Sequence, residues 1–364
     1  MIKFFDLHRQ DKVLFKYFLK DLKTLLKKND YILGNSVKKF EEKFSKFCGS
    51  KYSIGVANGT DALTLALKAL NLKEGSEVII PAMTYCSTAF AVINANLKPV
   101  LVDIENDSPL IATNKIKNKI NQKTKVIMPV HLYGSVVDID KIKKLIKRKD
   151  IFLIDDCSQA HGAMYDYKNK KKSVGSLADI SCFSLYPGKN LGAYGDAGIV
   201  TTNSKKFYKI IKNLRNLGSD KKFEHTKIGY NSRLDTIQSL ILLRKLKFLP
   251  KNNNKRKKIA DIYNNEIENK NIEKIKYTKY SVYHQYVIKT SKRNKLIKLF
   301  NKNKVQYGFH YPKSINQLAI FKKTFSKKRF TNAEKLAKEG ISLPIDPNLE
   351  IKQVKKIVKL INSI

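Results

Sequence analysis

The sequence predicts an α/β protein with two domains: a large domain with a mainly parallel, seven-stranded sheet between helices, and a smaller C-terminal α+β domain. Three observations support this prediction. Short runs of β-forming residues alternate with helical patterns along the chain up to Leu249, as in a parallel sheet that helices cover on both faces. The composition changes abruptly after Leu249-Pro250 to lysine and asparagine. Beyond that point, helices and strands follow one another in a different alternation.

The chain begins with a segment, residues 1–30, that contains one amphipathic helix. From Lys12 to Lys28 the apolar residues recur at helical spacing, and lysines occupy the opposite face. A second helix is predicted from Val37 to Phe47, where Cys48-Gly49 ends it. We therefore expect the large domain over residues 31–249 and the small domain over residues 250–364.

Seven strands and their connecting helices form the predicted large domain. The strands are expected at Ser53 to Ala57, Glu77 to Ile80, Pro99 to Asp103, Val126 to Val130, Ile151 to Asp155, Asp179 to Ser184 and Gly198 to Thr202. The helical patterns lie at Asp61 to Leu70, Thr84 to Asn94, Asp138 to Lys147 and Leu234 to Leu246. Because the last three strands follow one another through short links, at least one of them is expected to be antiparallel.

The predicted small domain begins with a helix after Pro250. A tyrosine-rich strand from Ser281 to Ile288, a helix from Ser291 to Asn301 and a strand that ends at Gly308 follow it. Two further helices complete the chain. No internal repeat is visible in the sequence.

The net charge of +41 raises the alternative of a nucleic-acid-binding protein. The charge is mostly lysine and is spread along the chain, however, whereas specific phosphate recognition favours clustered arginine. The densest tracts, Lys168 to Lys172 and Lys251 to Lys258, are interpreted as a loop and a surface helix. We therefore expect neither nucleic acid nor a membrane as partner.

The four cysteines are scattered without the spacing of a metal site or a disulfide framework. They indicate reduced core residues. The sequence has neither an apolar run long enough to span a membrane nor a signal-peptide pattern. A cytoplasmic protein is therefore expected.

Lys189 lies just after a predicted strand that stops at Pro187-Gly188. Open α/β sheets place their ligands at the carboxyl ends of strands, and a desolvated lysine amine forms Schiff bases, most often with pyridoxal phosphate. A lysine in a loop is usually only a solvated charge, so the position alone decides nothing. A nucleotide P-loop is excluded because Asn190 follows the lysine.

The apolar strand from Ile151 ends in two adjacent acids, Asp155 and Asp156. A buried carboxylate needs a partner, and a protonated pyridine nitrogen would supply one. A metal is the other candidate partner, but no histidine stands in a ligand spacing with these acids, and no metal is expected.

Three further segments place polar or aromatic residues at predicted element ends. Gly59 and Thr60 begin a helix directly after the first strand, where free amides make either an anion site or an ordinary cap. Tyr85 follows the second strand and either stacks on a flat ring or packs in the interior. Asn231 and Arg233 precede the last helix of the large domain, a position that most often means a cap.

Six motifs occur in order along the chain. They are Asn58-Gly59-Thr60-Asp61-Ala62-Leu63, Pro81-x-x-Thr84-Tyr85, Ile154-Asp155-Asp156-x-x-Gln159-Ala160-His161-Gly162, Phe183-Ser184-x-x-x-x-Lys189, Gly229-Tyr230-Asn231-x-Arg233 and His310-Tyr311-Pro312. Together they resemble the motifs of the DegT family of nucleotide-sugar aminotransferases, which have the aspartate-aminotransferase-like fold, fold type I of the pyridoxal-phosphate enzymes. The resemblance extends over nearly the whole chain.

The resemblance implies a role for each site residue. Lys189 is the Schiff-base lysine, and Asp156 rather than Asp155 faces the pyridine nitrogen of pyridoxal 5′-phosphate. Asp155 stands where the family more often has glutamate. The other implied cofactor contacts are Gln159 near the phenolic oxygen, Tyr85 on the ring, Gly59, Thr60 and Ser184 at the phosphate, and Asn231 entering from a second subunit. The implied substrate-side residues are His310, Arg233 and Tyr186.

The resemblance also implies the reaction: an amino group passes from an amino acid, expected to be L-glutamate, to a ketone of a nucleotide-linked sugar. The run from Tyr186 to Ala193 resembles relatives that act on dTDP-linked 3-keto-6-deoxyhexoses, so amination at C3 is expected, in deoxyamino-sugar biosynthesis for surface polysaccharide. A homodimer with shared active sites is implied. Another pyridoxal-phosphate enzyme of this fold, a dehydratase or an amino-acid lyase, stays an alternative, although dehydratase relatives replace the lysine with histidine.

Overall fold

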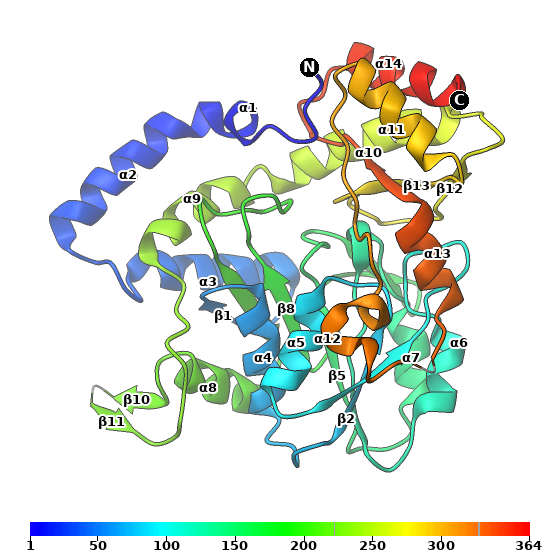
Figure 1. Ribbon diagram of the computed structural model, residues 1–364. Helices are drawn as coiled ribbons and strands as arrows, with labels where there is room; N and C mark the ends of the chain where they lie inside the picture. Colours follow the sequence, from blue (N-terminus) through cyan, green and yellow to red (C-terminus); the bar gives the residue numbers. More distant parts are fainter. Residues whose placement is uncertain (222, 327) are drawn as a thin grey trace.

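The computed structural model describes residues 1–221, 223–326 and 328–364, and a seven-stranded sheet forms its centre (Figure 1). The strand order is β1-β9-β8-β5-β4-β2-β3. The strands are β1 (Tyr52–Val56), β2 (Glu77–Pro81), β3 (Lys98–Val102), β4 (Thr124–Ile127), β5 (Phe152–Asp156), β8 (Ile180–Ser184) and β9 (Gly198–Thr202). β9 is antiparallel to both of its neighbours, and the other pairs are parallel. The predicted fold class and the antiparallel strand are thus confirmed.

Residues along each strand alternate between two apolar cores, one on each face of the sheet. Ile154 of β5 and Cys182 of β8 belong to the core that also contains residues of α4, α5 and α8. Their neighbours Leu153 and Phe183 belong to the core that contains residues of α3, α7 and α9. Because successive side chains of a strand point to opposite faces, Asp155 and Asp156 at the end of β5 must also point apart.

The helices of this part agree with most of the predicted ranges. They are α1 (Leu7–Asp11), α2 (Phe15–Lys28), α3 (Asn35–Cys48), α4 (Gly59–Ala69), α5 (Cys86–Asn94), α6 (Thr113–Ile116), α7 (Ile139–Leu145), α8 (Lys205–Leu214) and α9 (Thr236–Leu246). Asn58 caps α4 by accepting from Asp61 N at 2.8 Å. α3 ends at Cys48, where Gly49 has a φ of +66°, a left-handed conformation that favours glycine.

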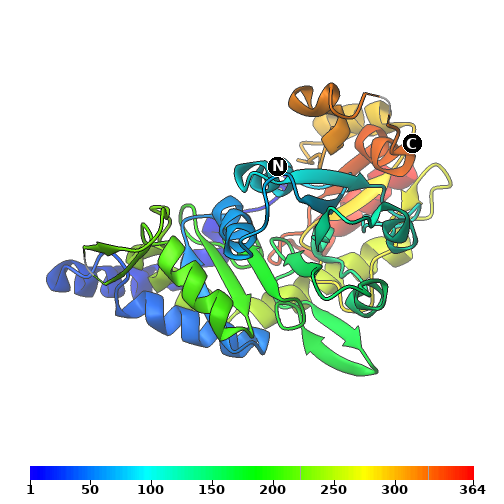
Figure 2. The same cartoon turned by 90° about the horizontal axis from the view of Figure 1, so that it is seen from below.

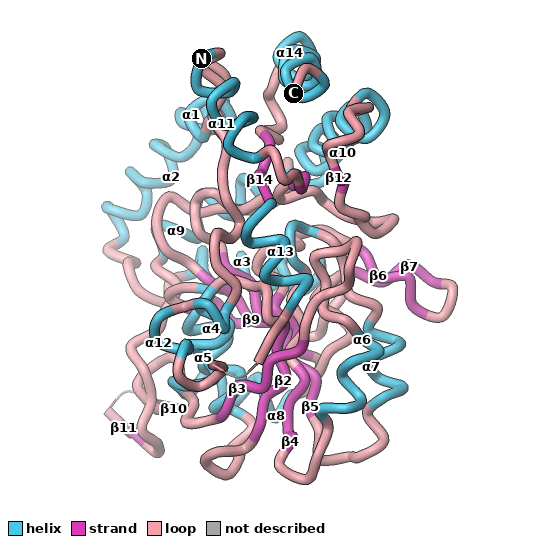
Figure 3. The backbone as a smooth tube through the Cα atoms, turned by 45° about the vertical axis from the view of Figure 1, so that its right-hand side comes forward, coloured by secondary structure: helices cyan, strands magenta, loops and turns pink. Residues whose placement is uncertain are grey.

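The lysine tract from Lys168 to Lys172 is not simply a loop, which corrects the prediction. It forms the turn and second strand of a hairpin, β6 (Met164–Tyr167) and β7 (Lys170–Ser173), beside α7 in Figure 3. Lys168 and Asn169 both have positive φ, as a tight hairpin turn requires. A second small hairpin pairs β10 (Ser219–Lys221) with β11 (Glu224–His225).

The C-terminal part of the chain contributes a three-stranded antiparallel sheet and the helices around it, at the end of the molecule opposite to α2 in Figure 2. Its elements are α10 (Leu249–Glu266), β12 (Glu273–Lys274), β13 (Tyr286–Lys289), α11 (Arg293–Lys302), α12 (Ala319–Lys322), α13 (Thr331–Glu339), β14 (Gly340–Leu343) and α14 (Ile351–Asn362). The tract from Lys251 to Lys258 lies in α10, as predicted.

The predicted strand that ends at Gly308 is reduced to two isolated bridges, Val305 with Ile2 and Gly308 with Ser342. Ile2 is buried in a third core with residues of α10, α11 and α14. The amino terminus of the chain therefore packs against its C-terminal part. The division at residues 249 and 250, where α10 begins, stays a prediction.

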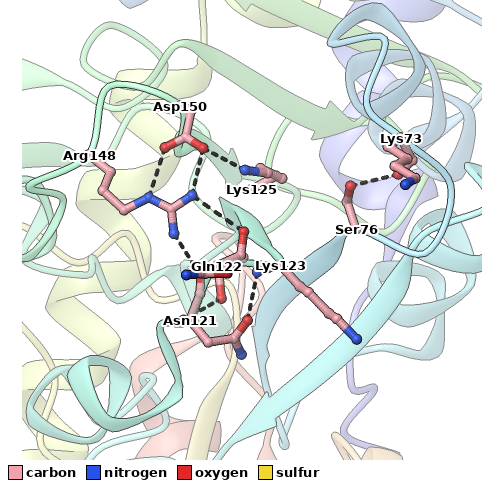
Figure 4. Close-up of polar contacts among 9 residues, drawn as sticks. Lys73, Ser76, Asn121, Gln122, Lys123, Lys125, Arg148 and Asp150 are labelled. Carbon is pink, nitrogen blue, oxygen red and sulfur yellow. Dashed lines mark hydrogen bonds and ion pairs between the residues drawn. The ribbon is translucent and has the colours of Figure 1, made fainter.

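Charged contacts occupy the edge of the sheet where β4 and β5 begin (Figure 4). Arg148 donates to both carboxylate oxygens of Asp150, at 2.9 and 2.6 Å, and Lys125 pairs with the same group. Hydrogen bonds from Arg148 and Lys125 lower the pKa of Asp150. Asp150 is exposed and lies at the other end of β5 from Asp156.

Among the described residues, none of the helices combines the length and apolar character needed to span a bilayer.

Candidate active site

Lys189 lies in the loop after β8, at the carboxyl edge of the sheet. Its backbone N donates to Tyr186 O at 2.9 Å across the turn that contains Pro187-Gly188. Desolvation lowers the pKa of the Lys189 amine to about 8, although the negative charge of Asp156 acts in the opposite direction. More of this amine is therefore neutral at physiological pH than of an exposed lysine, and the neutral amine is the form that attacks a carbonyl.

Asp156 is the last residue of β5, the strand that pairs with β8. Its side chain is only 4% exposed. Oδ2 accepts from Thr88 Oγ1 at 2.9 Å, and Oδ1 accepts from Ser158 N at 3.1 Å. These hydrogen bonds fix the orientation of the carboxylate close to Lys189. Sequence analysis missed Thr88, because a single threonine inside a helix carries no signal of its own.

Asp155 points to the opposite face and is fully buried. Its Oδ2 accepts hydrogen bonds from Tyr165 Oη and from His131 Nε2. Because His131 Nδ1 accepts from Val137 N at 3.1 Å, the neutral ring carries its proton on Nε2. Burial alone would raise the pKa of Asp155, but the hydrogen bonds that its carboxylate accepts, from His131 and Tyr165 among others, outweigh burial and keep this pKa below its usual value.

His131, Asp155 and Cys157 bring three potential ligand atoms within 4.8 Å of one another. Sequence analysis found no histidine in a ligand spacing with the acids, since His131 stands far from them along the chain and only the fold brings them together. Both ring nitrogens of His131 already have hydrogen-bond partners. The arrangement is thus a buried hydrogen-bonded network behind Asp156.

The start of α4 and the end of β8 meet closely enough to form an anion cradle. A Cβ at Gly59 would lie 2.5 Å from Ser184 Cβ, so a side chain there would fill the space between them. Thr60 Oγ1 donates to Ser87 Oγ at 2.8 Å. The free amides at the start of α4 and the hydroxyls of Thr60 and Ser184 suit a phosphate group.

Gln159, Tyr85 and Tyr311 form a connected group beside this cradle. Gln159 Oε1 accepts from Tyr133 N at 2.6 Å, and its Nε2 donates to Tyr311 Oη at 2.9 Å. The rings of Tyr311 and Tyr85 have their centroids 5.4 Å apart. The ring of Tyr85 is about half exposed, which leaves a face free to stack on a ligand.

Three histidines near Lys189 are kept neutral. Burial, together with the charge of Lys189, lowers the pKa of His310 to about 4 and that of His161 to about 3. The same two causes lower the pKa of His284, whose Nδ1 lies 3.0 Å from Asn190 Oδ1. Neutral imidazoles do not repel the cationic lysine, and they can donate and accept hydrogen bonds at physiological pH.

This arrangement of a desolvated lysine, an oriented carboxylate and an anion cradle fits a phosphate-bearing carbonyl cofactor. The model of the DegT/DnrJ/EryC1/StrS aminotransferase family matches residues 14–362. The chain belongs to this family.

Curated relatives align with this chain over nearly its full length. This chain is 39% identical to the dTDP-3-amino-3,6-dideoxy-alpha-D-galactopyranose transaminase of Aneurinibacillus thermoaerophilus, over 100% of this chain and 99% of that protein. It is 34% identical to the UDP-2-acetamido-2-deoxy-3-oxo-D-glucuronate aminotransferase of Pseudomonas aeruginosa, over 98% of each.

Two crystal structures show the same fold. DesV of Streptomyces venezuelae has a TM-score of 0.95 and 30% identity and covers 100% of this chain and 98% of its own. NtdA of Bacillus subtilis, with bound cofactor PMP, has a TM-score of 0.91 and 28% identity, over 99% of this chain and 84% of its own. The predicted family, the predicted activity class of sugar-nucleotide transaminase and the predicted cofactor, pyridoxal 5′-phosphate, are confirmed.

Three predicted site residues of this DegT-family aminotransferase are less buried than Asp156. Asn231 is exposed and forms an isolated bridge with Asn216. Arg233 is half-buried, and its Nη1 donates to Asn216 Oδ1 at 3.2 Å. Tyr186 is 55% exposed, three residues before Lys189. The roles of these residues toward cofactor and substrate stay predictions.

Proposed function

We propose that this aminotransferase moves an amino group from L-glutamate to C3 of a dTDP-linked 3-keto-6-deoxyhexose, in the cytoplasm, as a step of deoxyamino-sugar biosynthesis. The observation that carries the chemistry is the placement of the desolvated Lys189, in the loop after β8, within the electrostatic influence of the oriented Asp156 at the end of the adjacent strand β5. The substrate class is supported by the relative that is named for a dTDP-linked 3-amino-3,6-dideoxy sugar and is 39% identical over the whole chain.

The residues present fit pyridoxal phosphate at each of its polar ends. Gly59, Thr60 and Ser184 would hold the phosphate, and Asp156 would hold the protonated ring nitrogen. The carboxylate would keep that nitrogen protonated, because an opposite charge favours the charged form. Gln159 would lie at the phenolic oxygen, and Tyr85 would stack on the ring. When bound, the cofactor supplies an electron sink for the carbanion that forms at the reacting carbon.

Lys189 has two tasks in this proposal. Its neutral amine would react with the cofactor's carbonyl group and hold the cofactor covalently between substrate cycles. Once an incoming amino acid had displaced it, Nζ would be free to take the proton from the donor's Cα and to deliver it to the former carbonyl carbon of the cofactor, on the far side of the donor nitrogen. The lowered pKa of Lys189 serves both tasks, because each needs the unprotonated amine.

Asn231 would complete the phosphate site from the second subunit of a homodimer. Its exposed position supports this assignment, because a residue that serves a partner's site must reach the surface of its own chain. The net charge of +41 would also attract an anionic nucleotide diphosphate and so speed its association.

The test is a screen of keto-sugar nucleotides with the purified enzyme and L-glutamate, followed by mass spectrometry of the products. We expect 2-oxoglutarate and an amino sugar from a dTDP-linked 3-keto-6-deoxyhexose. Amination of a UDP- or GDP-linked sugar alone, or of a 4-keto sugar, would overturn the substrate, and formation of a deoxygenated sugar without an amino group would overturn the reaction.

A further inference from the structure

Aromatic side chains form a connected path around the loop that holds Lys189. Five rings follow one another with centroid separations of 6.1, 5.8, 5.6 and 5.4 Å, in the order Phe5, Phe4, His310, Tyr311 and Tyr85. Two of these rings belong to the first five residues of the chain, far in sequence from every motif of the site. The function described above does not account for them.

The amino-terminal segment is held in place by backbone pairing with the C-terminal part of the chain. Ile2 N donates to Lys304 O at 2.8 Å, and Gln306 N donates to Ile2 O at 2.9 Å. Phe4 N donates to Gln306 Oε1 at 2.9 Å. The two phenylalanines are therefore presented from a fixed backbone.

Phe4 stacks on the ring of His310, with centroids 5.8 Å apart and planes inclined by 15°. Gly308 leaves the room for this pair, since a Cβ there would lie 2.9 Å from His310 Cε1 and 3.3 Å from Phe4 Cζ. The other side of the imidazole is tied by Nδ1, 2.8 Å from Ser342 Oγ. Phe4 and Ser342 together determine where His310 points.

The ring of Phe5 lies beside Gly188, the residue that precedes Lys189. A Cβ at Gly188 would be 3.9 Å from Phe5 Cζ and 3.5 Å from Tyr186 Cε1, so both rings flank the glycine that precedes Lys189. Phe5 is 46% exposed and Tyr186 55%. Half-exposed aromatic rings beside a reactive group offer apolar faces to a ligand.

We propose that Phe5 contacts the hexose ring of the substrate and that Phe4 is a positioning residue that holds His310 toward the same ring. This inference rests on the proposed function. The carbon to be aminated has to reach the amine carried beside Lys189, so the hexose is the part of the substrate nearest to Gly188. In a sugar nucleotide, the diphosphate separates the hexose from the nucleoside, so the nucleotide base lies farther from Gly188. The C–H faces of a deoxyhexose pack well on an aromatic ring.

The test uses the holoenzyme and four variants: Phe5→Leu, Phe5→Tyr, Phe4→Leu and, as a matched control, Leu19→Ala, which removes a side chain of similar exposure (56%) from α2. Three quantities are measured: the KM for the keto-sugar nucleotide, the rate of the glutamate half-reaction from the visible absorbance of the cofactor, and the inhibition constant of the free nucleoside diphosphate. Cofactor absorbance also reports loading, so a misfolded variant is recognised directly.

We expect Phe5→Leu to raise the KM for the keto sugar about five- to tenfold, while the glutamate half-reaction and the inhibition constant stay within about twofold. Phe5→Tyr should have a KM close to that of the wild type, because tyrosine keeps the aromatic ring. An unchanged KM in Phe5→Leu would overturn the contact. An equal rise in the inhibition constant would move the contact to the base and overturn the assignment to the hexose.

The role of Phe4 is tested by a double-mutant cycle with His310→Gln. If Phe4 acts through His310, Phe4→Leu should weaken turnover of the keto sugar in the wild type and have no further effect in the His310→Gln background. Additive losses would overturn the positioning role. Should the wild-type protein convert no keto-sugar nucleotide, the proposed function fails first and this inference falls with it.

Discussion

Thr88 Oγ1, on α5, donates a buried hydrogen bond of 2.9 Å to Asp156 Oδ2 at the end of β5. Removing a hydrogen bond to a charged group costs about 1.5 to 3 kcal/mol. We therefore expect Thr88→Val, which keeps the shape of the side chain, to lower kcat/KM about 10- to 100-fold. Steady-state kinetics on the keto sugar would measure this loss.

Thr84→Val is the matched control, because Thr84 Oγ1 lies 2.9 Å from Thr88 Oγ1 on the same helix-entry segment. Its hydroxyl reaches the carboxylate only through Thr88, so a smaller loss is expected. Equal losses in the two variants would show that the direct bond to Asp156 is not what matters.

Asp156→Asn and Asp155→Asn should fail in different ways. Asp156→Asn removes the expected partner of the ring nitrogen and should lower kcat about 100-fold or more. Asp155→Asn keeps that partner but disturbs the buried network with His131 and Tyr165, so it should retain most of kcat and lose about 1 to 3 kcal/mol of stability. Kinetics and thermal unfolding of each variant separate the two effects.

The control for both variants is Asp150→Asn, which removes an exposed carboxylate from the residue two positions before β5. We expect it to change neither kcat nor the unfolding midpoint appreciably, because exposed ion pairs contribute little. A loss of kcat in Asp155→Asn as large as that in Asp156→Asn would mean that the wrong carboxylate was assigned.

Capture of the cofactor should depend on the pKa of Lys189. Its amine must be unprotonated to react, so the rate at which cofactor-free enzyme binds pyridoxal phosphate should rise with pH and reach half its maximum at a pH of about 8, the pKa of Lys189. Asp156 raises this pKa by its negative charge. In Asp156→Asn the midpoint should therefore move to lower pH.

Stopped-flow absorbance at several pH values measures this midpoint. Borohydride reduction followed by peptide mapping identifies the lysine, and we expect the reduced cofactor on Lys189. A label on another lysine, or a midpoint near that of an exposed amine, would refute the assignment.

The shared active site can be tested by mixing two defective proteins. Lys189→Ala and Asn231→Ala chains are unfolded together and refolded. In a mixed dimer with shared sites, one site collects both lesions and the other collects neither. Random pairing makes about half of the dimers mixed, so about a quarter of the wild-type activity should return.

The comparison is with each parent protein unfolded and refolded alone, because Asn231→Ala keeps some activity if only one hydrogen bond is lost. A mixture no more active than the average of its parents would place Asn231 in the site of its own chain.

The sequence by itself determined which runs of residues form strands and which polar residues follow the end of each strand. These features are local. An apolar run such as Phe152–Ile154 is predictable because its burial follows from its own composition, and Pro187-Gly188 marks the turn before Lys189 without reference to any other segment. The motifs at the strand ends then indicated the family, its cofactor and the lysine.

Only the tertiary structure decided which residues support those motifs. His131 meets Asp155, Thr88 meets Asp156 and Phe4 meets His310 across separations of 24, 68 and about 300 residues. No local pattern encodes such contacts, because each depends on how strands are ordered and how the amino terminus pairs with the C-terminal part. The same reason explains why the composition of the lysine tract predicts a loop where the structure has β7: only the pairing with β6 makes a strand of these solvated residues, whose composition does not favour one.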